Sequence, residues 1–322
     1  MEISFIIPYY NNHPYLHECL DSISAHTSCK YEVIIIDDGS ADLSDLKAIT
    51  DPRAHIIYSG PRGGPSHARN IGIDQALGKY LMFVDSDDTL VSDPSTVIDI
   101  ASTVPDGTIA DILVGTESKT PLNSALNKKS PFVGCLKSEP RLGRLHYFFA
   151  MLYRRTFIEQ HQIRFDTAMQ SGGDLVFLSK CLSTATNILL TNTPLYHYRR
   201  RPNSITHSEL TFEKVQCRLK LIERMADHYK AYPTARTLRA LGAFNTNMYM
   251  TKRTQKHLGT EKALWFIKGL TRWVVEVFED DTLIQDCKDR YFVDWSPVHD
   301  QIVGAMRSNS SPAEILKLIE TF

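Results

Sequence analysis

The amino-acid sequence predicts an α/β fold with a mostly parallel central sheet flanked by helices, followed by a helical C-terminal region. Over the first part of the chain, short runs of apolar, β-branched residues alternate with segments whose apolar residues recur at helical spacing. From about Leu210 onward only the helical spacing continues. Because 322 residues are enough for two domains, we expect an α/β domain over residues 1–205 and a helical region over residues 206–322.

The first two predicted strands are residues 3–7 and 31–36, which are short, apolar and rich in β-branched side chains. Between them, residues 14–26 place apolar side chains at helical spacing. Asn12 is a suitable N-cap for this helix, and Pro14 is tolerated in its first turn. The segment therefore predicts a β-α-β unit with parallel strands.

Two further strands are predicted at residues 55–58 and 80–84. They are joined by the glycine-rich loop 60–65 and by a helix over residues 66–77, which ends near Gly78, where glycine is a favourable C-terminal cap. The alternation of strands and helices is typical of an open α/β sheet, in which ligands bind beyond the carboxyl ends of the strands.

An acidic tetrad with the sequence Asp-Ser-Asp-Asp, residues 85–88, follows the fourth strand directly. Carboxylates spaced in this way can hold Mg²⁺ or Mn²⁺ and leave coordination positions open for diphosphate oxygens. At the neighbouring strand ends, Tyr10 can stack on a base, and Asp37 or Asp38 can accept hydrogen bonds from a base N–H or from ribose hydroxyls. Together these strand ends predict a site for a nucleoside diphosphate and a divalent metal ion.

Each of these features has a structural alternative. An acidic tetrad can cap the helix that follows it, and Asp38 and Ser40 can simply form a turn, because Asp-Gly is a strong turn signal. Two other nucleotide-binding motifs are missing, since no GxGxxG follows the first strand and GxxxxGK[ST] occurs nowhere in the sequence. The sequence therefore disfavours a dinucleotide site and a P-loop.

Four segments of the chain, in register, resemble family 2 glycosyltransferases of the GT-A fold. They are residues 4–11 (SFIIPYYN), 32–40 (EVIIIDDGS), 68–72 (ARNIG) and 78–88 (GKYLMFVDSDD). The resemblance implies transfer of a sugar from a nucleotide-diphospho-sugar, with a UDP-sugar as the first choice, inversion at the anomeric carbon, and a divalent metal, Mn²⁺ or Mg²⁺. It also implies a donor-binding half over about residues 1–115 and an acceptor half over about residues 115–205.

The resemblance further implies roles for individual residues in donor binding. It places Pro8, Tyr10 and Asp37 or Asp38 at the nucleoside, Arg69 near the base and the phosphates, Asp85 and Ser86 near the ribose and the metal, and Asp87 on the metal with Asp85. Because Arg69 lies in a predicted helix, its structural alternative is a solvated side chain.

Asp174 is the catalytic residue that the resemblance implies. Inverting transfer requires a base that takes the proton of the acceptor hydroxyl. Residues 170–177 (QSGGDLVF) resemble the family's acidic pair and the apolar helix after it, and residues 152–157 and 163–165 match the sequence that precedes the base. Gly173 departs from the pattern, because most relatives have Glu there. The structural alternative for Asp174 is helix capping, for which Asp is a favoured residue.

A basic segment at residues 194–207 follows. In similar enzymes this segment closes over the donor diphosphate, and the resemblance assigns that role to Arg199, Arg201 and Ser204. Arginine offers planar bidentate donors to phosphate, and its charge offsets the charge that develops on the leaving oxygen. For any one of these arginines the alternative is a solvated or salt-bridged side chain, and His197 is more often an ordinary polar residue than a metal ligand.

Composition and charge narrow the class of protein. A net charge of −1 argues against a nucleic-acid-binding surface, and the six cysteines show no CxxC spacing, which is typical of reduced, cytosolic thiols. Since a strand is predicted from residue 3, we expect no signal peptide, and no apolar run approaches the roughly 20 residues that span a bilayer. We expect a cytoplasmic location, free or at the inner face of the cytoplasmic membrane.

The later part of the chain carries no recognisable chemistry. Residues 115–145 are polar and predict an irregular excursion that borders the acceptor cleft. Residues 262–278 form an amphipathic helix whose polar stripe contains Lys268, Arg272 and Glu276. The mixed charge of that stripe favours internal packing or a contact between subunits over a membrane surface, because interfacial helices favour Lys and Arg. Homo-oligomerisation and peripheral membrane association stay open.

We therefore expect a metal-dependent inverting glycosyltransferase that transfers a sugar to a glycan or lipid-linked glycan in surface polysaccharide biosynthesis. One alternative is a nucleotidyltransferase, which needs a glycine-rich, basic loop after the first strand, and residues 8–11 are not such a loop. The other is a protein that binds sugar nucleotides or acts as a scaffold without transfer, for which Gly173 is the only support.

Overall fold

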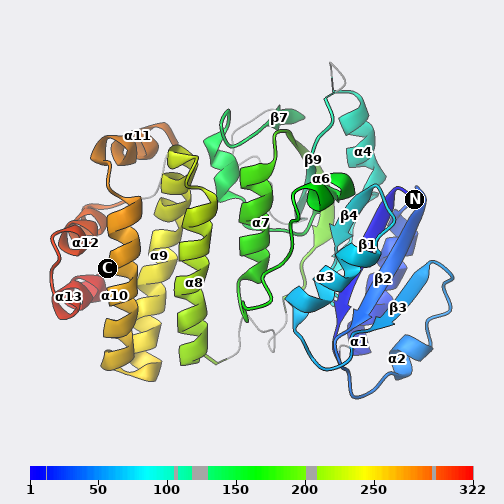
Figure 1. Cartoon of the computed structure of the whole chain (residues 1–322), viewed down its shortest axis with the longest axis horizontal. Helices are drawn as coiled ribbons and strands as arrows, with labels where there is room; N and C mark the ends of the chain where they lie inside the picture. The colour runs from blue at the N-terminus through cyan, green and yellow to red at the C-terminus, as the bar shows by residue number, and fades with distance from the viewer. Residues whose placement is uncertain (12, 105–107, 118–129, 201–208, 292–294, 322) are drawn as a thin grey trace. The chain divides into compact units, whose positions relative to one another are not determined.

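The structure is a computed structural model of the chain, and it describes residues 1–11, 13–104, 108–117, 130–200, 209–291 and 295–321 (Figure 1). The chain forms two compact units. Unit 1 comprises Met1–Cys135, His146–Met169 and Gly173–Arg201, and unit 2 comprises Leu136–Leu145, Gln170–Gly172 and Pro202–Phe322. The domain boundary expected at residues 205–206 lies outside the described residues, and two short segments from the expected α/β domain group with the helices.

Unit 1 is built on one mixed sheet. Its strands in the described ranges are β1 Ile3–Tyr9, β2 Tyr31–Asp37, β3 Ala54–Tyr58, β4 Tyr80–Phe83, β5 Thr89–Leu90, β6 Ile112–Glu117, β7 Phe132–Gly134, β8 Met151–Arg154 and β9 Ile188–His197. The strand order is β3-β2-β1-β4-β8-β6-β9-β5, with β7 paired to β9. As predicted, β3, β2, β1 and β4 are parallel, so that the carboxyl ends of β1, β2 and β4 meet at one edge. In contrast, β8, β5 and β7 run antiparallel to their neighbours.

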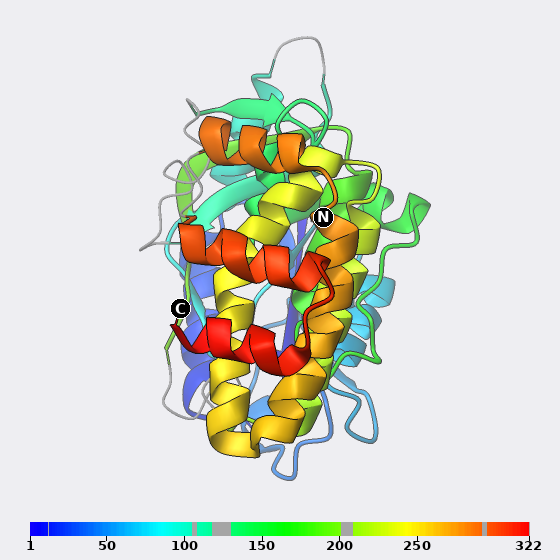
Figure 2. The ribbon, with the colours of Figure 1, turned by 90° about the vertical axis from the view of Figure 1, so that its left-hand side faces the viewer.

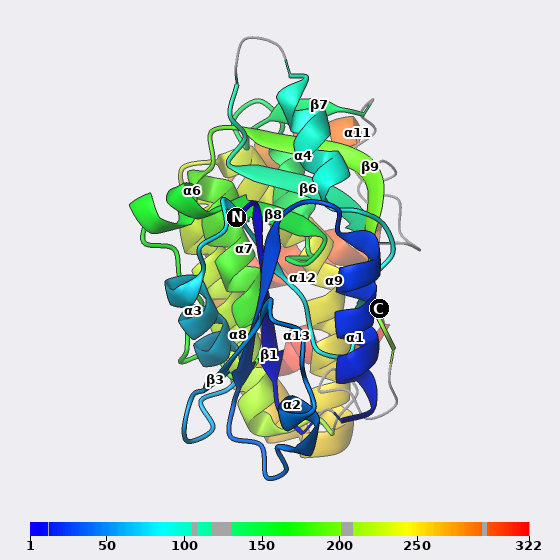
Figure 3. The ribbon, with the colours of Figure 1, turned by 90° about the vertical axis from the view of Figure 1, so that its right-hand side faces the viewer.

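Helices cover both faces of the parallel strands. The helices of unit 1 in the described ranges are α1 His13–His26, α2 Ser44–Lys47, α3 Pro65–Gln75, α4 Ser95–Ser102, α6 Arg155–Gln160 and α7 Gly173–Thr184. Figure 3 shows α1 and α3 on opposite faces of β1 and β2. In α1 the apolar face of Leu16, Cys19 and Ile23 is fully buried. Because both faces of these strands are covered, their side chains form continuous apolar runs rather than an alternating pattern.

Two glycines let α3 and the start of β4 approach the first strands closely. At Gly72 of α3 an added Cβ would lie 2.3 Å from Ile6 Cγ2 of β1. At Gly78 an added Cβ would lie 2.5 Å from the backbone nitrogen of Ser4. The helix itself ends at Gln75, earlier than the predicted cap at Gly78, so the glycine there is explained by close packing rather than by capping.

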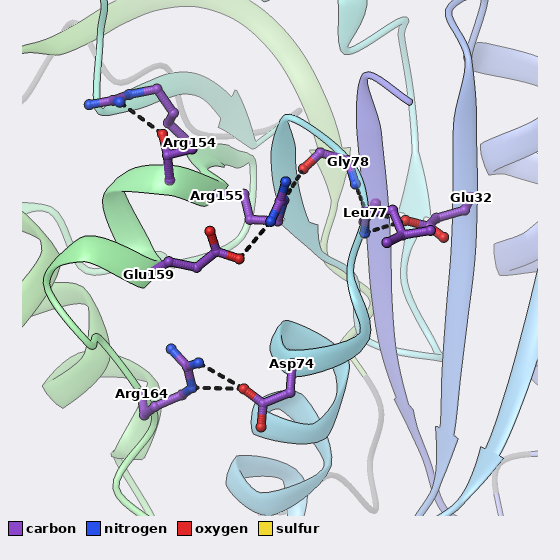
Figure 4. Close-up of polar contacts among 10 residues, drawn as sticks. Glu32, Asp74, Leu77, Gly78, Arg154, Arg155, Glu159 and Arg164 are labelled. Carbon is purple, nitrogen blue, oxygen red and sulfur yellow. Dashed lines mark hydrogen bonds and ion pairs between the residues drawn. The ribbon is translucent and has the colours of Figure 1, made fainter.

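Polar contacts attach the chain around residues 155–165 to α3 and to the entry of β4 (Figure 4). Arg155 donates from Nε to the carbonyl of Gly78 at 2.9 Å, and Arg164 forms a 2.7 Å ion pair with Asp74 of α3. Next to Arg164, the backbone of Phe165 is held by the side-chain amide of Asn70. This amide donates to the Phe165 carbonyl at 2.9 Å and accepts from the Phe165 N–H at 2.8 Å. The chain that leads into α7 is therefore anchored to α3.

Unit 2 contains the helices α8 Phe212–His228, α9 Pro233–Leu258, α10 Thr260–Val277, α11 Asp281–Tyr291, α12 Pro297–Arg307 and α13 Pro312–Thr321, together with the 3₁₀ helix η2 Pro140–Arg144. Figure 1 shows α8, α9 and α10 side by side, and Figure 2 shows α12 and α13 lying across α9 and α10. Their core includes Phe244, Phe266 and Val274, all fully buried. Within the described ranges, no helix carries an apolar stretch of the length needed to span a bilayer.

Two expectations for the later chain are refined by the structure. The apolar face of α10 packs inside unit 2, where Trp273 is buried, while Trp265 stays partly exposed against Phe212. Residues 115–145 are less irregular than expected, since they contain the end of β6, β7 and η2, while residues 118–129 lie outside the described ranges. The strand β7 was missed because three residues are too few to show periodicity.

Candidate active site

The carboxyl end of β2 carries Asp37 and Asp38, and both are buried. Asp37 accepts the N–H of Ser40 at 3.1 Å, which makes the turn after the strand. Asp38 accepts the N–H groups of Gly63 and Gly64, each at 2.8 Å and each on a different carboxylate oxygen. The turn role that the Asp-Gly sequence predicted is therefore present, and Asp38 additionally shapes the glycine-rich loop that leads into α3.

The end of β1 places Pro8 and Tyr10 beside that loop. Pro8 is paired with Ile36 inside the sheet, and Tyr10 is the exposed aromatic directly after the strand. The guanidinium of Arg62, from the glycine-rich loop, lies 4.0 Å from the centre of the Tyr10 ring. Sequence reasoning missed Arg62, although its place in a glycine-rich loop at the end of a strand was a usable signal. Tyr10 and Arg62 together form an aromatic and cationic surface at this edge.

Arg69 of α3 is 7% exposed, so the solvated alternative for this residue is wrong. Its Nη2 lies 2.6 Å from Oδ1 of Asp85, and its guanidinium stacks over the rings of Phe148 and Phe165 at 4.7 and 5.4 Å. Apolar walls and an ion pair hold the arginine in one orientation. Arg69 therefore fixes the first carboxylate of the acidic tetrad.

The acidic tetrad forms a tight turn closed by a tyrosine from β9. The N–H of Asp88 donates to the carbonyl of Asp85 at 3.0 Å. The hydroxyl of Tyr196 accepts the N–H of Asp85 at 3.0 Å and donates to the Asp88 carboxylate at 2.7 Å. Burial and the charge of Asp85 raise the pKa of Asp88 to about 8. Asp88 thus points inward, while Asp85 and Asp87 stay partly exposed and Ser86 is buried between them.

A divalent metal requires oxygen ligands, and the partly exposed pair Asp85 and Asp87 supplies them. No group of three or more His, Cys, Asp or Glu side chains in the described part of the chain is arranged to hold an ion. Two carboxylates are nevertheless a suitable set for Mg²⁺ or Mn²⁺ when phosphate oxygens and water complete the coordination. The residues present therefore fit a metal that is shared with a diphosphate.

Asp174 is the second residue of α7, so it lies inside the first turn of the helix and not at the N-cap position that its structural alternative assumes. Burial raises the pKa of its carboxyl, the positive charge of Arg69 lowers it, and the charge of Asp85 raises it. These influences place Asp174 within electrostatic range of the Arg69 and Asp85 pair. A carboxylate with a raised pKa that is influenced by Asp85, one of the two carboxylates suited to a metal, has the properties of a general base.

Gly173 has a steric reason to be glycine. An added Cβ would lie 2.7 Å from the hydroxyl oxygen of Ser66, in the first turn of α3. Ser66 is itself buried, so its side chain already occupies the space that a larger residue at position 173 would need. The departure from the family pattern is therefore matched by a neighbouring side chain, and it does not remove Asp174 from the site.

Of the predicted lid residues, only Arg199 lies in the described ranges, and Arg201 and Ser204 lie outside them. Arg199 donates from its backbone N–H to Asp88 at 2.8 Å and from Nε to the carbonyl of Asp87 at 2.8 Å. Its Nη2 forms a 2.6 Å ion pair with Glu18 of α1. Arg199 therefore takes the salt-bridged alternative and attaches the end of β9 to the acidic turn.

The site combines residues that the sequence predicted with others that it did not. Asp88 and Tyr196 were not assigned roles, although both stand in segments singled out by the sequence. No local pattern pairs them, because 108 residues separate them along the chain. The arrangement offers an aromatic surface for a nucleobase, a pair of carboxylates for a metal, and a partly buried carboxylate for proton transfer.

Comparison with known sequences agrees with this arrangement. A sequence profile described as "Glycosyl transferase family 2" matches residues 4–162. "Uncharacterized glycosyltransferase EpsJ" of Bacillus subtilis (strain 168) is 30% identical over 217 residues, which cover 63% of this chain and 62% of EpsJ. "Succinoglycan biosynthesis protein ExoO" of Rhizobium meliloti (strain 1021) is 28% identical over 228 residues, which cover 64% of this chain and 62% of ExoO. The chain thus spans less than two thirds of the length of these relatives.

Solved structures extend the likeness to the whole fold. The crystal structure of S. aureus TarS 1-349 in complex with UDP-GlcNAc matches with a TM-score of 0.76 at 19% identity, covering 100% of this chain and 91% of that chain. At this identity the likeness concerns the fold alone. It confirms the predicted α/β fold of the GT-A type with a helical C-terminal region.

Proposed function

Because the chain belongs to glycosyl transferase family 2, we propose that it transfers a sugar from a nucleotide-diphospho-sugar to a glycan acceptor. The observation that supports this most directly is the group formed by Arg69, Asp85 and Asp174, in which a partly buried carboxylate lies within electrostatic range of a fixed ion pair. A binding protein would need no base at that point.

We propose a UDP-sugar as donor. Tyr10 supplies a face for stacking the base, and Arg62 above it adds positive charge beside the phosphates. TarS, which shares the fold, was crystallised with UDP-GlcNAc, and this supports a uridine nucleotide without specifying the sugar. Asp37 and Asp38 support the turn and the glycine-rich loop next to Tyr10 and Arg62 through hydrogen bonds to backbone N–H groups.

We propose an inverting reaction in which Asp174 removes the acceptor proton. Its raised pKa brings the carboxyl nearer to neutral pH, where a base of this kind is most effective. Arg69 keeps Asp85 in place, and its positive charge opposes the pKa increase at Asp174, which favours the ionised form of the base. A divalent ion held by Asp87 and Asp85 would neutralise the diphosphate as it leaves.

For the acceptor we propose a surface polysaccharide or a lipid-linked glycan, with the reaction taking place in the cytoplasm. ExoO is named for succinoglycan biosynthesis, which supports a polysaccharide-forming role for a chain of this type. The aligned region is only part of that relative, so the acceptor of this chain is a separate proposal.

The proposal is tested by measuring UDP release from a panel of UDP-sugars with Mn²⁺, with and without glycan acceptors. Asp174→Asn should keep donor affinity and lose transfer by at least about a hundredfold, the usual scale of a general base. Asp166→Asn is the matched control, because Asp166 precedes α7 in an exposed loop turn. Tight donor binding without turnover in the wild type would favour a sugar-nucleotide-binding protein. Loss of turnover in Asp166→Asn but not in Asp174→Asn would identify Asp166 as the base instead of Asp174.

A further inference from the structure

Unit 2 contains a hydrogen-bonded pair of polar side chains between α8 and α9. Arg218 of α8 donates from Nε to the side-chain oxygen of Asn247 of α9 at 2.7 Å. Arg218 is partly buried, and Asn247 is fully buried. A charged group and an amide in such a position require partners, because burying either without them costs free energy.

Arg218 lacks a counter-charge. Within the described ranges, its only hydrogen-bond partner is Asn247, and no carboxylate forms an ion pair with it. Burial and, to a smaller extent, the positive charge of Arg239 on α9 together lower the pKa of its guanidinium to about 10. Arg239 donates to the carbonyls of Arg144 and Leu145, at the end of η2. The positive charges of the two guanidinium groups therefore influence each other.

The side-chain N–H groups of Asn247 have no acceptor in the described part of the chain. Its amide nitrogen is buried and has no hydrogen-bond partner in the described part of the chain, while its oxygen is already occupied by Arg218. The open valences at this point are therefore all donors: the terminal N–H groups of Arg218 and the N–H groups of Asn247. Only an acceptor, and preferably a negatively charged one, satisfies both residues at once.

We propose that Arg218 and Asn247 form a binding site for an oxyanion, a phosphate or carboxylate group carried by the acceptor. Arginine presents a planar fork that matches either group bidentately, and the amide supplies a further donor beside it. The oxyanion would supply the missing counter-charge and the missing acceptor together.

The proposed glycan acceptor is one source of such an anion, because a phosphate or carboxylate group on it would supply the acceptor oxygens that both residues need. The identification of the ligand as an acceptor group rests on the proposed function, whereas the existence of an oxyanion site does not.

The oxyanion site is tested first by thermal unfolding of the whole chain in sodium chloride, inorganic phosphate or sodium acetate at equal ionic strength. A bound anion raises the Tm with a saturable dependence on its concentration. We expect this increment for phosphate, acetate or both in the wild type, and its loss in Arg218→Met with Asn247→Leu. Lys220→Met is the matched control, because it removes one positive charge from the exposed face of the same helix.

The sign of the stability change separates a ligand site from a structural contact. In chloride the Arg218→Met, Asn247→Leu variant should be at least as stable as the wild type, because it removes a partly buried charge without a counter-charge and an unpaired amide. If that variant does not fold, Arg218→Lys serves instead, since it keeps the charge but loses the fork and should weaken the anion increment. A wild type with no increment, or a double variant with the wild-type increment, overturns the proposal.

Transfer assays then identify the source of the oxyanion. Arg218→Met should raise the acceptor KM by about 30-fold or more, the scale on which loss of a buried charge contact weakens binding, while donor hydrolysis without acceptor stays at the wild-type rate. An unchanged acceptor KM together with a lost phosphate increment would reject the acceptor as the source. If the wild type shows neither transfer nor hydrolysis, the proposed function fails, and the Tm measurement still decides the oxyanion site.

Discussion

The contact between Gly173 and Ser66 offers a direct test of why this chain has glycine before its proposed base. A Cβ at position 173 would lie 2.7 Å from the Ser66 hydroxyl oxygen, whereas ordinary contacts begin near 3.4 Å. The two atoms must therefore move apart by about 0.7 Å. Overpacking of this kind costs about 1–3 kcal/mol, and removal of glycine from a helix returns up to about 1 kcal/mol. We expect Gly173→Ala to destabilise the chain by about 1 kcal/mol.

The assay is a double-mutant cycle in urea. Ser66→Ala removes the oxygen that an added Cβ would meet, so the double variant should regain the stability that Gly173→Ala lost. The coupling free energy between the two positions is then about 1–2 kcal/mol, the range found for residues in contact. As a control, Gly304→Ala in α12 places its Cβ where nothing lies within 4 Å, and it should show no coupling to Ser66→Ala. Additive effects at positions 66 and 173 would refute the steric explanation.

Three further predictions follow from the carboxylates at the ends of β2 and β4. The pKa of Asp88 is about 8 in the native state and about 4 in the unfolded state, so the native state binds more protons between these two pH values. The free energy of unfolding should therefore fall as the pH rises from about 4 to about 8, by at most about 1.4 kcal/mol per pH unit. Urea melts in EDTA at pH 5 to 9 check this, and Asp88→Asn should remove the slope; an equal slope in both proteins contradicts the assignment. Asp38→Ala leaves the backbone N–H groups of Gly63 and Gly64 without their acceptor, so it should lower the free energy of unfolding by about 2–4 kcal/mol in the same melts. It should also weaken UDP binding in calorimetry, and unchanged values of both would show that the loop does not depend on this carboxylate. Asp87→Ala should abolish the Mn²⁺-dependent part of UDP binding while leaving the Tm within a few degrees of the wild type; wild-type turnover that survives EDTA would remove the metal from the proposal.

The donor half was predictable because its signals are local. Strands such as β1 and β2 are covered on both faces, which requires continuous apolar runs, and their parallel pairing puts polar residues after each strand at one edge. The tetrad at residues 85–88 could be placed on the correct loop for the same reason. Some element ends were wrong, as at α3, where close packing at Gly78 resembles a helix cap in the sequence, and the short elements α2, β5 and α4 were not predicted.

The side-chain partnerships could not be predicted, because they join positions far apart in the chain. Tyr196 meets Asp88 across 108 residues, and Gly173 meets Ser66 from a different helix. Arg199 shows the same difficulty in another form. Its sequence context implies contact with a phosphate, but the geometry of α1 supplies Glu18 as a nearer partner. Charge type and motif position identify candidates for a site, whereas the partner that each side chain selects depends on the packed fold.

Four carboxylates of the candidate site lie in different environments, and these environments suit them to different roles. They are Asp85, Asp87, Asp88 and Asp174. Asp88 is buried and hydrogen-bonded by Tyr196, and its raised pKa keeps it protonated for much of the accessible pH range, which suits a structural group. Asp85 is paired with Arg69, so its charge is largely compensated before any ligand binds. Asp87 is partly exposed, which suits a carboxylate proposed to bind a cation.

Asp174 occupies the remaining environment. Burial raises its pKa, and the guanidinium of Arg69 opposes that increase, so the carboxyl has a higher proton affinity than an exposed aspartate while the positive charge favours its ionised form. A base requires this combination, because it must be free of a proton before the reaction and able to hold one afterwards. Removing the positive charge with Arg69→Met should therefore raise the pKa of Asp174 and shift the acidic limb of the transfer rate to higher pH. An acidic limb that stays in place in that variant would show that another group titrates there.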